Sequence, residues 1–377
     1  MTTKKQKIGL ALSGGGVRAM AFHSGVMRWL AQKGLLEDID HISSVSGGSL
    51  FIGLVLSSNN LKWPTSQEYL EKIEPKIKKI LITDCLQKSA VIKLLKPSNW
   101  RYILSRANVL SKTIEELWSI KGNLNDLPSN PIWSINGTTA ETGRRFRFKL
   151  DKCGDYELGY ADAKYFSIAQ AMAVSAAFPI GIGPLAIETA DFTWKKKPWN
   201  ASDDDLEEVI LDFEKLHIYD GGIYDNLGIE PLFDIGLRNL KNDIDYLVVS
   251  DAGAPLERIA PKSILNPFRA IRLLDITMDQ TRALRIRGYV NYLINNPDSG
   301  LYIQIGAPSM GSINKFKNQN EAVATALLRD DWLSAGACNS ASMYETDLKK
   351  MEEDKFELLS RHGYETAKWN SCMFGVE

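Results

Sequence analysis

The serine at position 46 has the neighbours that a catalytic nucleophile requires. It stands in the stretch SVSGGS at residues 44–49, with small residues two positions before it and two positions after it. This spacing is typical of a nucleophile elbow, a sharp turn between a strand and a helix that exposes the serine hydroxyl. Gly48 satisfies the second small position, whereas Ser44 stands where an elbow usually has glycine. The alternative is that Ser46 only caps the helix that follows.

Three consecutive glycines, Gly14, Gly15 and Gly16, lie between an apolar run and a helical pattern. Because glycine has no Cβ, the backbone can turn tightly there and direct several N–H groups into one concave site. The start of the following helix adds a positive partial charge. Such a site binds an anion, either the phosphate of a nucleotide or the oxyanion formed when an ester is attacked.

The nucleotide alternative depends on the dinucleotide fingerprint G-x-G-x-x-A, which ends here at Ala19. That fingerprint needs an acidic residue near the end of the second strand to hold a ribose. The second strand is predicted at 41–46 and ends in serine, while Glu37, Asp38 and Asp40 all precede it. The sequence also contains no G-x-x-x-x-G-K-[ST] motif. It therefore disfavours a nucleotide at the glycine loop.

A nucleophilic serine needs a base, and an aspartate is the best candidate for it. Asp220 is placed at the end of a strand predicted over 215–222, and Gly221 and Gly222 leave its carboxylate open to close approach. The alternative is an aspartate in an ordinary turn, since Asp-Gly is a common turn signal. The histidines lack triad spacing and are predicted to be structural or exposed: His23, His41, His217 and His362.

The elements that must position these residues alternate between strands and helices. Apolar runs predict further strands, at 8–13, 131–139, 144–150, 244–253 and 300–306. Helical spacing predicts helices at 17–33, 47–59, 167–180 with a break at Pro179, and 266–290. The opening order of strand, glycine loop, helix, strand, turn and helix implies a largely parallel sheet with helices on both faces. Residues 186–215 are predicted to be a polar excursion.

Three motifs in this order, SGGGVR, SVSGGS and DGGIYDN, resemble those of the patatin-like phospholipases. The segment AMAVSAAFPIGIGPL between the serine and the aspartate resembles a further stretch of that family. The similarity extends over about residues 8–253, with Ser44 in the elbow and Phe178 ahead of Pro179 as departures. The resemblance implies a three-layer α/β/α patatin-like fold with a mostly parallel central sheet, a helical insertion and a C-terminal extension.

The resemblance also implies a lipid acyl hydrolase that cleaves fatty-acyl esters of glycerophospholipids through an acyl-enzyme. Ser46 is then the nucleophile, Asp220 the base, and the amides of Gly14, Gly15 and Gly16 the oxyanion hole. The supporting residues are Arg18, which anchors that loop or polarises the site, and Gly48, Gly221 and Gly222. The alternatives are a carboxylesterase or lysophospholipase on smaller esters, and a catalytically silent lipid-binding or signalling protein. Bacterial members of the family include antiphage-defence effectors switched on by a nucleotide, which leaves a nucleotide activator and such a role open.

Length and composition favour one soluble domain. The 377 residues are 44% hydrophobic with a formal net charge of −1, so no nucleic acid partner is indicated. We expect a single domain with a core at about 8–255, a helical insertion at about 61–125 and a C-terminal extension at about 256–377. The four cysteines form no C-x-x-C pair, which favours free thiols in a reducing compartment and no metal. No cofactor is expected, and a homo-oligomer is left open.

A basic stretch within the predicted insertion suggests contact with lipid. Between Lys76 and Lys112 the lysines and arginines far outnumber acidic residues, and Ile, Leu, Trp100 and Tyr102 are interleaved with them. Such a surface can approach anionic headgroups. The alternative is an ordinary solvated helical cap. Since the apolar run after the first lysines fits a strand rather than a signal peptide, we expect a cytoplasmic protein that associates peripherally with membranes when active.

Overall fold

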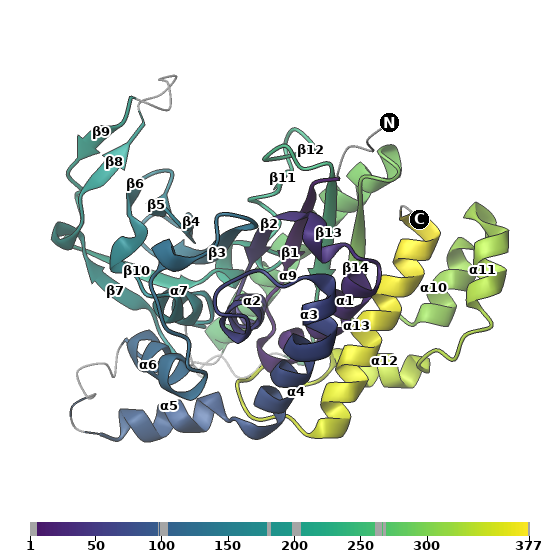
Figure 1. Ribbon diagram of the computed structural model, residues 1–377. Coiled ribbons are helices and arrows are strands. Elements are labelled where there is room, and N and C mark those ends of the chain that lie inside the picture. The colour runs from purple at the N-terminus through teal and green to yellow at the C-terminus, as the bar shows by residue number, and fades with distance from the viewer. Residues whose placement is uncertain are drawn as a thin grey trace.

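Five parallel strands form the centre of the structure (Figure 1). In their order across the sheet they are β14 (Gly300–Gln304), β13 (Tyr246–Asp251), β1 (Ile8–Leu12), β2 (Ile39–Ser44) and β3 (Ile132–Thr139). Strand β1 reads IGLAL and all of its side chains are buried, as expected for a strand covered by helices on both faces. The computed structural model describes residues 6–96, 98, 105–178, 182–197, 205–260, 266 and 269–375. Pro179, Trp100 and Tyr102, which entered our sequence predictions, lie outside these ranges.

Helices cover both faces of the parallel strands and make three layers. One face carries α1 (Gly16–Gln32), α2 (Gly47–Ser58) and α13 (Glu353–Phe374), and the other carries α9 (Arg269–Asn295). Leu10 and Leu12 of β1 pack into the core of the first face, whereas Ala11 packs into the core that contains Tyr289 of α9. One strand therefore supplies two cores by simple alternation of its side chains. The predicted three-layer α/β/α fold is confirmed.

Beyond β3 the sheet continues as an antiparallel wing, which projects at the upper left of Figure 1. Its strands are β4 (Arg145–Phe148), β5 (Lys152–Asp155), β6 (Gly159–Asp162), β8 (Trp194–Lys196) and β9 (Glu207–Val209). Two more strands, β7 (Leu185–Glu188) and β10 (Lys215–Asp220), pair with each other, and β10 also pairs with β3. The predicted polar excursion at 186–215 thus contains strands, which are too short to show a clear alternation.

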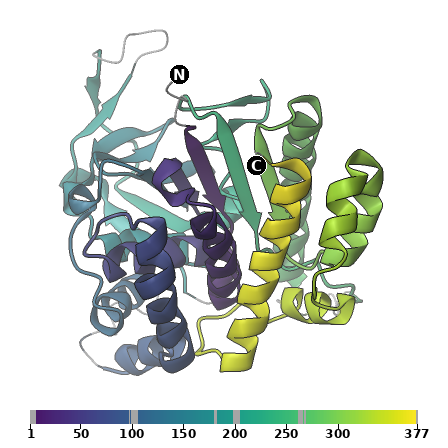
Figure 2. The same cartoon turned by 45° about the vertical axis from the view of Figure 1, so that its right-hand side comes forward.

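The C-terminal third of the chain is part of the same core. Strand β14 completes one edge of the sheet, and α13 lies along α1 in front of the parallel strands (Figure 2). The two helices approach closely because a glycine of each helix packs against the backbone of the other helix. A Cβ on Gly25 would collide with the carbonyl of Ser360, and one on Gly363 with the carbonyl of Phe22.

The predicted insertion is helical over its described residues. It contains α3 (Ser66–Glu68), the π-helical turn η2 (Tyr69–Ile73), α4 (Glu74–Thr83), α5 (Leu86–Leu94) and α6 (Ala107–Leu117). The remaining helices are α7 (Ile168–Ser175), α8 (Gly222–Asp225), α10 (Ser309–Phe316), α11 (Glu321–Leu327) and α12 (Ala335–Ser342). Short strands β11 (Phe233–Asp234) and β12 (Asn239–Leu240) form a separate hairpin. Among the described helices none has an apolar stretch that could span a bilayer.

Candidate active site

Two strands that run in opposite directions bring Ser46 and Asp220 together. Strand β2 pairs in parallel with β3, where Ser44 lies opposite Ile135. Strand β10 pairs antiparallel with β3, where Asp220 lies opposite Gly137. The carboxyl ends of β2 and β10 therefore face each other beside β3. The hydroxyl of Ser46, in the turn just after β2, interacts with the Asp220 carboxylate and acts to lower its pKa.

The turn at Ser46 has the geometry of a nucleophile elbow. Ser46 adopts a φ of 49°, an uncommon conformation for a residue with a side chain. Although it occupies the N-cap position of α2, its side chain forms no capping hydrogen bond. The turn is tight, because a Cβ on Gly48 would lie 2.6 Å from the Leu12 carbonyl oxygen, and one on Gly47 would collide with Gly16. The capping alternative is therefore wrong, and both glycines are required by close packing.

A chain of buried hydroxyl groups, from Ser44, Ser49 and Ser175, supports the backbone of the elbow. Ser44 Oγ accepts a hydrogen bond from Trp133 Nε1 at 2.8 Å and lies 2.9 Å from Ser49 Oγ. Ser49 Oγ lies 2.8 Å from Ser175 Oγ, which in turn accepts the amide hydrogen of Ser46 at 3.0 Å. Serine at position 44, where an elbow usually has glycine, is thus explained by an indole N–H that needs an acceptor. Ser175 lies in the segment AMAVSAAFPIGIGPL, and no motif around it in the sequence indicates this role.

Asp220 is buried, and its environment suits a general base. Burial raises the pKa of its carboxyl group to about 7, although a hydrogen bond from the Gly222 amide at 2.7 Å and the Ser46 hydroxyl both act in the opposite direction. A Cβ on Gly222 would lie 3.0 Å from Asp220 Oδ1, and one on Gly221 would collide with the Asn136 carbonyl. Both glycines thus allow close approach, as predicted, but they begin helix α8 rather than a simple turn.

The glycine loop lies between β1 and α1 and faces the same space. Gly15 and Gly16 have φ values of 142° and 59°, which favour glycine, and both line a cavity with Ser46. In the described part of the chain their amides have no hydrogen-bond partner. The amide of Gly14 instead donates to the carbonyl of Asn226 at 3.0 Å. Two of the three predicted donors are therefore available for an oxyanion, and Gly14 supports the loop.

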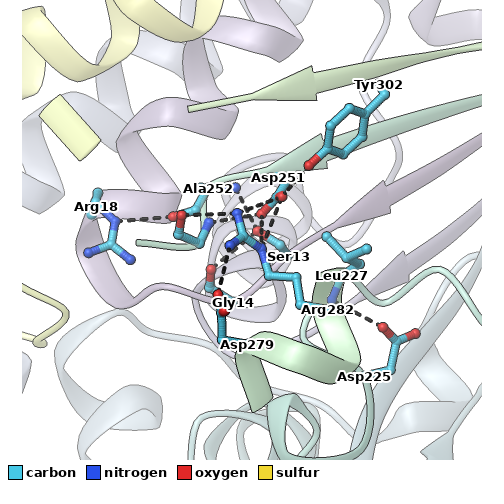
Figure 3. A network of polar contacts seen from close by, with 11 residues as sticks. Ser13, Gly14, Arg18, Asp225, Leu227, Asp251, Ala252, Asp279, Arg282 and Tyr302 are labelled. Carbon is cyan, nitrogen blue, oxygen red and sulfur yellow. Dashed lines mark hydrogen bonds and ion pairs between the residues drawn. The ribbon is translucent and has the colours of Figure 1, made fainter. Parts of the chain in front are cut away.

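Arg18 acts as an anchor between distant segments. It is buried, and its Nε donates to the carbonyl of Ala252 at 3.1 Å while its Nη1 donates to the carbonyl of Tyr344 (Figure 3). Burial, together with the nearby charge of Arg282, lowers the pKa of Arg18 to about 10. Of the two roles expected from the sequence, these contacts favour the anchoring of the loop.

The cavity beside Ser46 and Asp220 has a volume of about 800 Å³ and two unlike walls. One wall, formed largely by the insertion, is apolar and consists of Val91, Leu94, Val109, Leu110, Phe178 and Ile182. The other wall follows one face of α9 and carries charged side chains, namely Arg272, Asp275, Asp279 and Arg282. Phe178, which we expected to influence pocket shape, indeed lines the cavity. An elongated molecule with an apolar end and a polar end fits such a space.

The four histidines all belong to the described residues, and none of them lines this cavity. Burial lowers the pKa of His23 and of His362 to about 4, and both bond to structural partners. His217 bonds to Glu141, and His41 contacts Asp40. Within the same ranges, no cluster of His, Cys, Asp and Glu side chains could hold a metal ion. Asp220 lines the cavity with Ser46, whereas none of the four histidines does.

Comparison with known proteins agrees with this architecture. The family model "Patatin-like phospholipase" matches residues 10–233. Human GIVD cytosolic phospholipase A2 is similar in structure, with a TM-score of 0.52 and 13% identity over 98% of this chain and 59% of the other. Its complex with methyl gamma-linolenyl fluorophosphonate and terbium chloride gives 0.51 and 14%, with 98% and 58% covered. VipD from Legionella pneumophila gives 0.40 and 15%, with 98% and 68% covered.

The chain thus spans about 59% of the length of the human phospholipase, and at this identity the likeness concerns the fold alone. No curated protein sequence matches the chain.

Proposed function

The chain belongs to the patatin-like phospholipase family, and on that premise we propose that it is a lipid acyl hydrolase that cleaves fatty-acyl esters of glycerophospholipids. The observation that carries this proposal is that Ser46 and a buried Asp220 line the same cavity and that the Ser46 hydroxyl interacts with the Asp220 carboxylate. A serine in a strained turn, a carboxylate with a raised pKa and unpaired amides together make the parts of an acyl-transfer site.

The reaction follows from the position of these groups. The hydroxyl oxygen of Ser46 attacks the ester carbonyl while its proton passes to the Asp220 carboxylate. The amides of Gly15 and Gly16 stabilise the resulting oxyanion. The tetrahedral intermediate collapses to an acyl-enzyme, and Asp220 returns the proton to the departing alcohol. Water then attacks the acyl-enzyme with the same base, which releases the fatty acid and restores Ser46.

The energetics of this scheme favour a strong contribution from the oxyanion donors. A carboxylate with a pKa of about 7 is a better base at neutral pH than an ordinary aspartate, but it is still far weaker than a serine alkoxide. One preorganised donor typically contributes roughly 3–4 kcal/mol to the stabilisation of the transition state. Two donors at Gly15 and Gly16 are therefore central to the proposed rate.

The two walls of the cavity support a phospholipid as the substrate. The apolar wall between α5 and α6 suits an acyl chain, since burying a methylene group is worth about 0.8 kcal/mol. The charged face of α9, which carries both guanidinium and carboxylate groups, suits the polar headgroup end of a lipid. A small ester would leave much of the 800 Å³ unfilled, which disfavours a simple carboxylesterase.

The outer surface of α5 supports a lipid bilayer as the physical partner. Three apolar side chains, Val91, Ile92 and Leu95, are 54%, 52% and 71% exposed. Lys88 and Lys96 lie on the same short segment, and Val91 also lines the cavity. Exposed apolar groups between lysines beside the cavity would insert shallowly among anionic headgroups, as a solvated cap would not.

The reaction is tested with a fluorophosphonate probe and a mixed phospholipid extract. We expect a covalent adduct on Ser46, and mass spectrometry should find free fatty acid and lysophospholipid. Ser46→Ala should abolish both, whereas Ser57→Ala on the same helix should leave both unchanged. Turnover of small esters alone would favour the carboxylesterase, and lipid binding without an adduct or products would favour a silent binding protein.

The lipid surface is tested by sedimentation with vesicles. Binding should increase with the fraction of phosphatidylglycerol and decrease with salt, because headgroup charge attracts the lysines. Ile92→Asp should weaken binding, whereas Ile210→Asp, fully exposed on the antiparallel wing, should not. Binding that ignores lipid charge and salt would contradict this partner. A nucleotide activator, an antiphage role and a homo-oligomer stay predictions from the sequence.

A further inference from the structure

Two arginines of α9 lie directly behind the candidate active site. Arg282 and Arg285 are three positions apart, so they project from the same side of the helix. Their side chains are only 10% and 12% exposed, and each pairs with a buried aspartate. The two aspartates lie at the ends of different elements. Asp251 is the last residue of β13, where the loop after it begins, and Asp225 is the last residue of α8, in the segment that follows β10. Both arginines lie outside the stretch that matches the family model.

Arg282 fixes the loop after β13 through several contacts (Figure 3). Its Nη2 lies 2.7 Å from Asp251 Oδ2, and its Nε lies 3.1 Å from each oxygen of that carboxylate. The same Nη2 donates to the carbonyl of Gly253 at 3.2 Å. Tyr302 donates its hydroxyl hydrogen to Asp251 Oδ2 at 2.6 Å. A planar guanidinium with this many contacts determines the position of the loop more narrowly than a single ion pair would.

The loop that Arg282 holds supports one side of the glycine loop. The amide of Ala252 donates to Ser13 Oγ at 2.7 Å, and the carbonyl of Ala252 accepts from Arg18. A Cβ on Gly15 would lie 3.0 Å from that same carbonyl oxygen. The position of Ala252 therefore fixes where the backbone of Gly15 can lie.

Arg285 fixes the loop after β10 in a comparable way. Its Nε lies 3.4 Å from Asp225 Oδ1, and its Nη1 lies 2.9 Å from Glu230 Oε2. Its Nη2 donates to the carbonyl of Tyr224 at 3.1 Å, and its guanidinium lies 5.2 Å from the centre of the Tyr224 ring. Asp225 also accepts the amide hydrogens of Leu227 and Glu230, so the loop is closed on this carboxylate.

The loop that Arg285 holds supports the other side of the glycine loop. The carbonyl of Asn226, next to Asp225, accepts the amide hydrogen of Gly14 at 3.0 Å. A Cβ added to Gly222 would lie 2.8 Å from the side-chain oxygen of Asn226. The loop therefore contacts both the glycine loop and the turn that follows Asp220.

We propose that Arg282 and Arg285 are positioning residues for hydrolysis, which hold the amides of Gly15 and Gly16 at the oxyanion from two sides. The inference rests on the proposed function, because it assigns the two arginines a role in that same reaction. Neither guanidinium touches a reacting atom, so each acts through a backbone loop. The donors of an oxyanion hole must be held within a fraction of an ångström, and a rigid pair of loops provides this.

The test replaces each arginine by lysine, which keeps the charge but cannot reproduce the forked contacts. Wild type, Arg282→Lys and Arg285→Lys are compared with Arg287→Lys, an exposed position on the same helix. Turnover of a p-nitrophenyl acyl ester is divided by the number of sites that a fluorophosphonate titrates. We expect kcat per site to fall about 10- to 100-fold in both variants, with KM nearly unchanged. This is less than the roughly 100- to 1,000-fold effect of a lost oxyanion donor, because the donors are displaced and not removed. Arg287→Lys should match wild type.

Several results would overturn the proposal. Folded Arg282→Lys and Arg285→Lys with wild-type kcat per site would do so, and so would a loss of activity fully explained by fewer folded molecules. If the lysine variants do not fold, Tyr302→Phe tests the proposal instead, because it removes only the Tyr302 hydroxyl that donates to the Asp251 carboxylate. It should lower kcat per site at a nearly native Tm, and an unchanged kcat would reject the role. A wild type without turnover or labelling would reject the proposed function itself.

Discussion

Ser46 and Asp220, far apart in the chain, meet because the two strands that carry them end on the same edge of β3 from opposite directions. A purely parallel sheet would place both carboxyl ends side by side on neighbouring strands. Here the antiparallel strand β10 continues the line of β2, so Asp220 approaches the turn at Ser46 from the opposite direction. The mixed topology of the sheet therefore positions the two residues of the proposed dyad.

The raised pKa of Asp220 predicts a pH dependence of the reaction. A general base works when it is ionised, so kcat/KM should rise with pH and level off above about 7. Below that pH it should fall about tenfold per pH unit, because only the ionised fraction is active. The measurement is a pH series with a neutral ester, whose own ionisation cannot contribute. A profile that levels off near pH 4 would indicate an ordinary solvated aspartate and would contradict this environment.

The same pKa predicts that the base is unfavourable for the stability of the fold. Because the folded protein binds this proton more tightly than the unfolded chain, the contribution of Asp220 to stability is lost as the pH rises from about 4 to about 7. Asp220→Asn removes the buried charge, so it should abolish hydrolysis and yet raise Tm relative to wild type, more at pH 8 than at pH 4. Thermal unfolding at both pH values measures this. Asp191→Asn, at an exposed position, is the control and should show no such difference.

Much of the candidate site could be predicted because its signals are local. The small residues around Ser46 and the glycines after Asp220 report tight turns, and tight turns restrict residue types over a few positions. The parallel centre of the sheet was equally visible, since strands buried on both faces are continuous apolar runs. The short wing strand β4 falls within the strand predicted at 144–150. By contrast, β7, β8 and β9 have only three or four residues, which is too few for their alternation to be recognised.

The long-range contacts could not be predicted for a different reason. Nothing near Arg282 in the sequence indicates that its partner is Asp251, because an ion pair leaves no spacing pattern when its members lie on separate elements. The same holds for the amide of Gly14, whose acceptor lies after β10. The packing of α13 against α1 depends on Gly25 and Gly363. In the sequence both look like ordinary helix glycines, because nothing near them indicates that the two helices lie side by side.

The hydroxyl chain below the elbow predicts energetic coupling between Ser44 and Trp133. Ser44→Ala leaves the buried indole N–H without its acceptor, which should lower the free energy of unfolding by about 1–3 kcal/mol. Trp133→Phe removes the donor, so the double variant should be more stable than the sum of the two single changes predicts, by at least about 0.5 kcal/mol. Denaturant unfolding of the four proteins measures the cycle. Strictly additive changes would show that the hydrogen bond contributes nothing.

A pair of glycine substitutions separates backbone strain from close packing at the oxyanion loop. Gly16 and Gly34 both have positive φ values, 59° and 69°, so alanine is strained at each, at a cost of about 1–2 kcal/mol. A Cβ on Gly34 meets nothing within 4 Å, whereas one on Gly16 would collide with the carbonyl of Asp347. Gly34→Ala should therefore lower only Tm, and Gly16→Ala should in addition lower kcat at least about tenfold by displacing an oxyanion donor. Thermal unfolding gives the two Tm values. The kcat of both variants is then measured about 20 °C below the lower Tm, where both are folded. Equal kcat values in the two variants would show that the contact between a Cβ at position 16 and Asp347 does not displace an oxyanion donor, which would contradict this prediction.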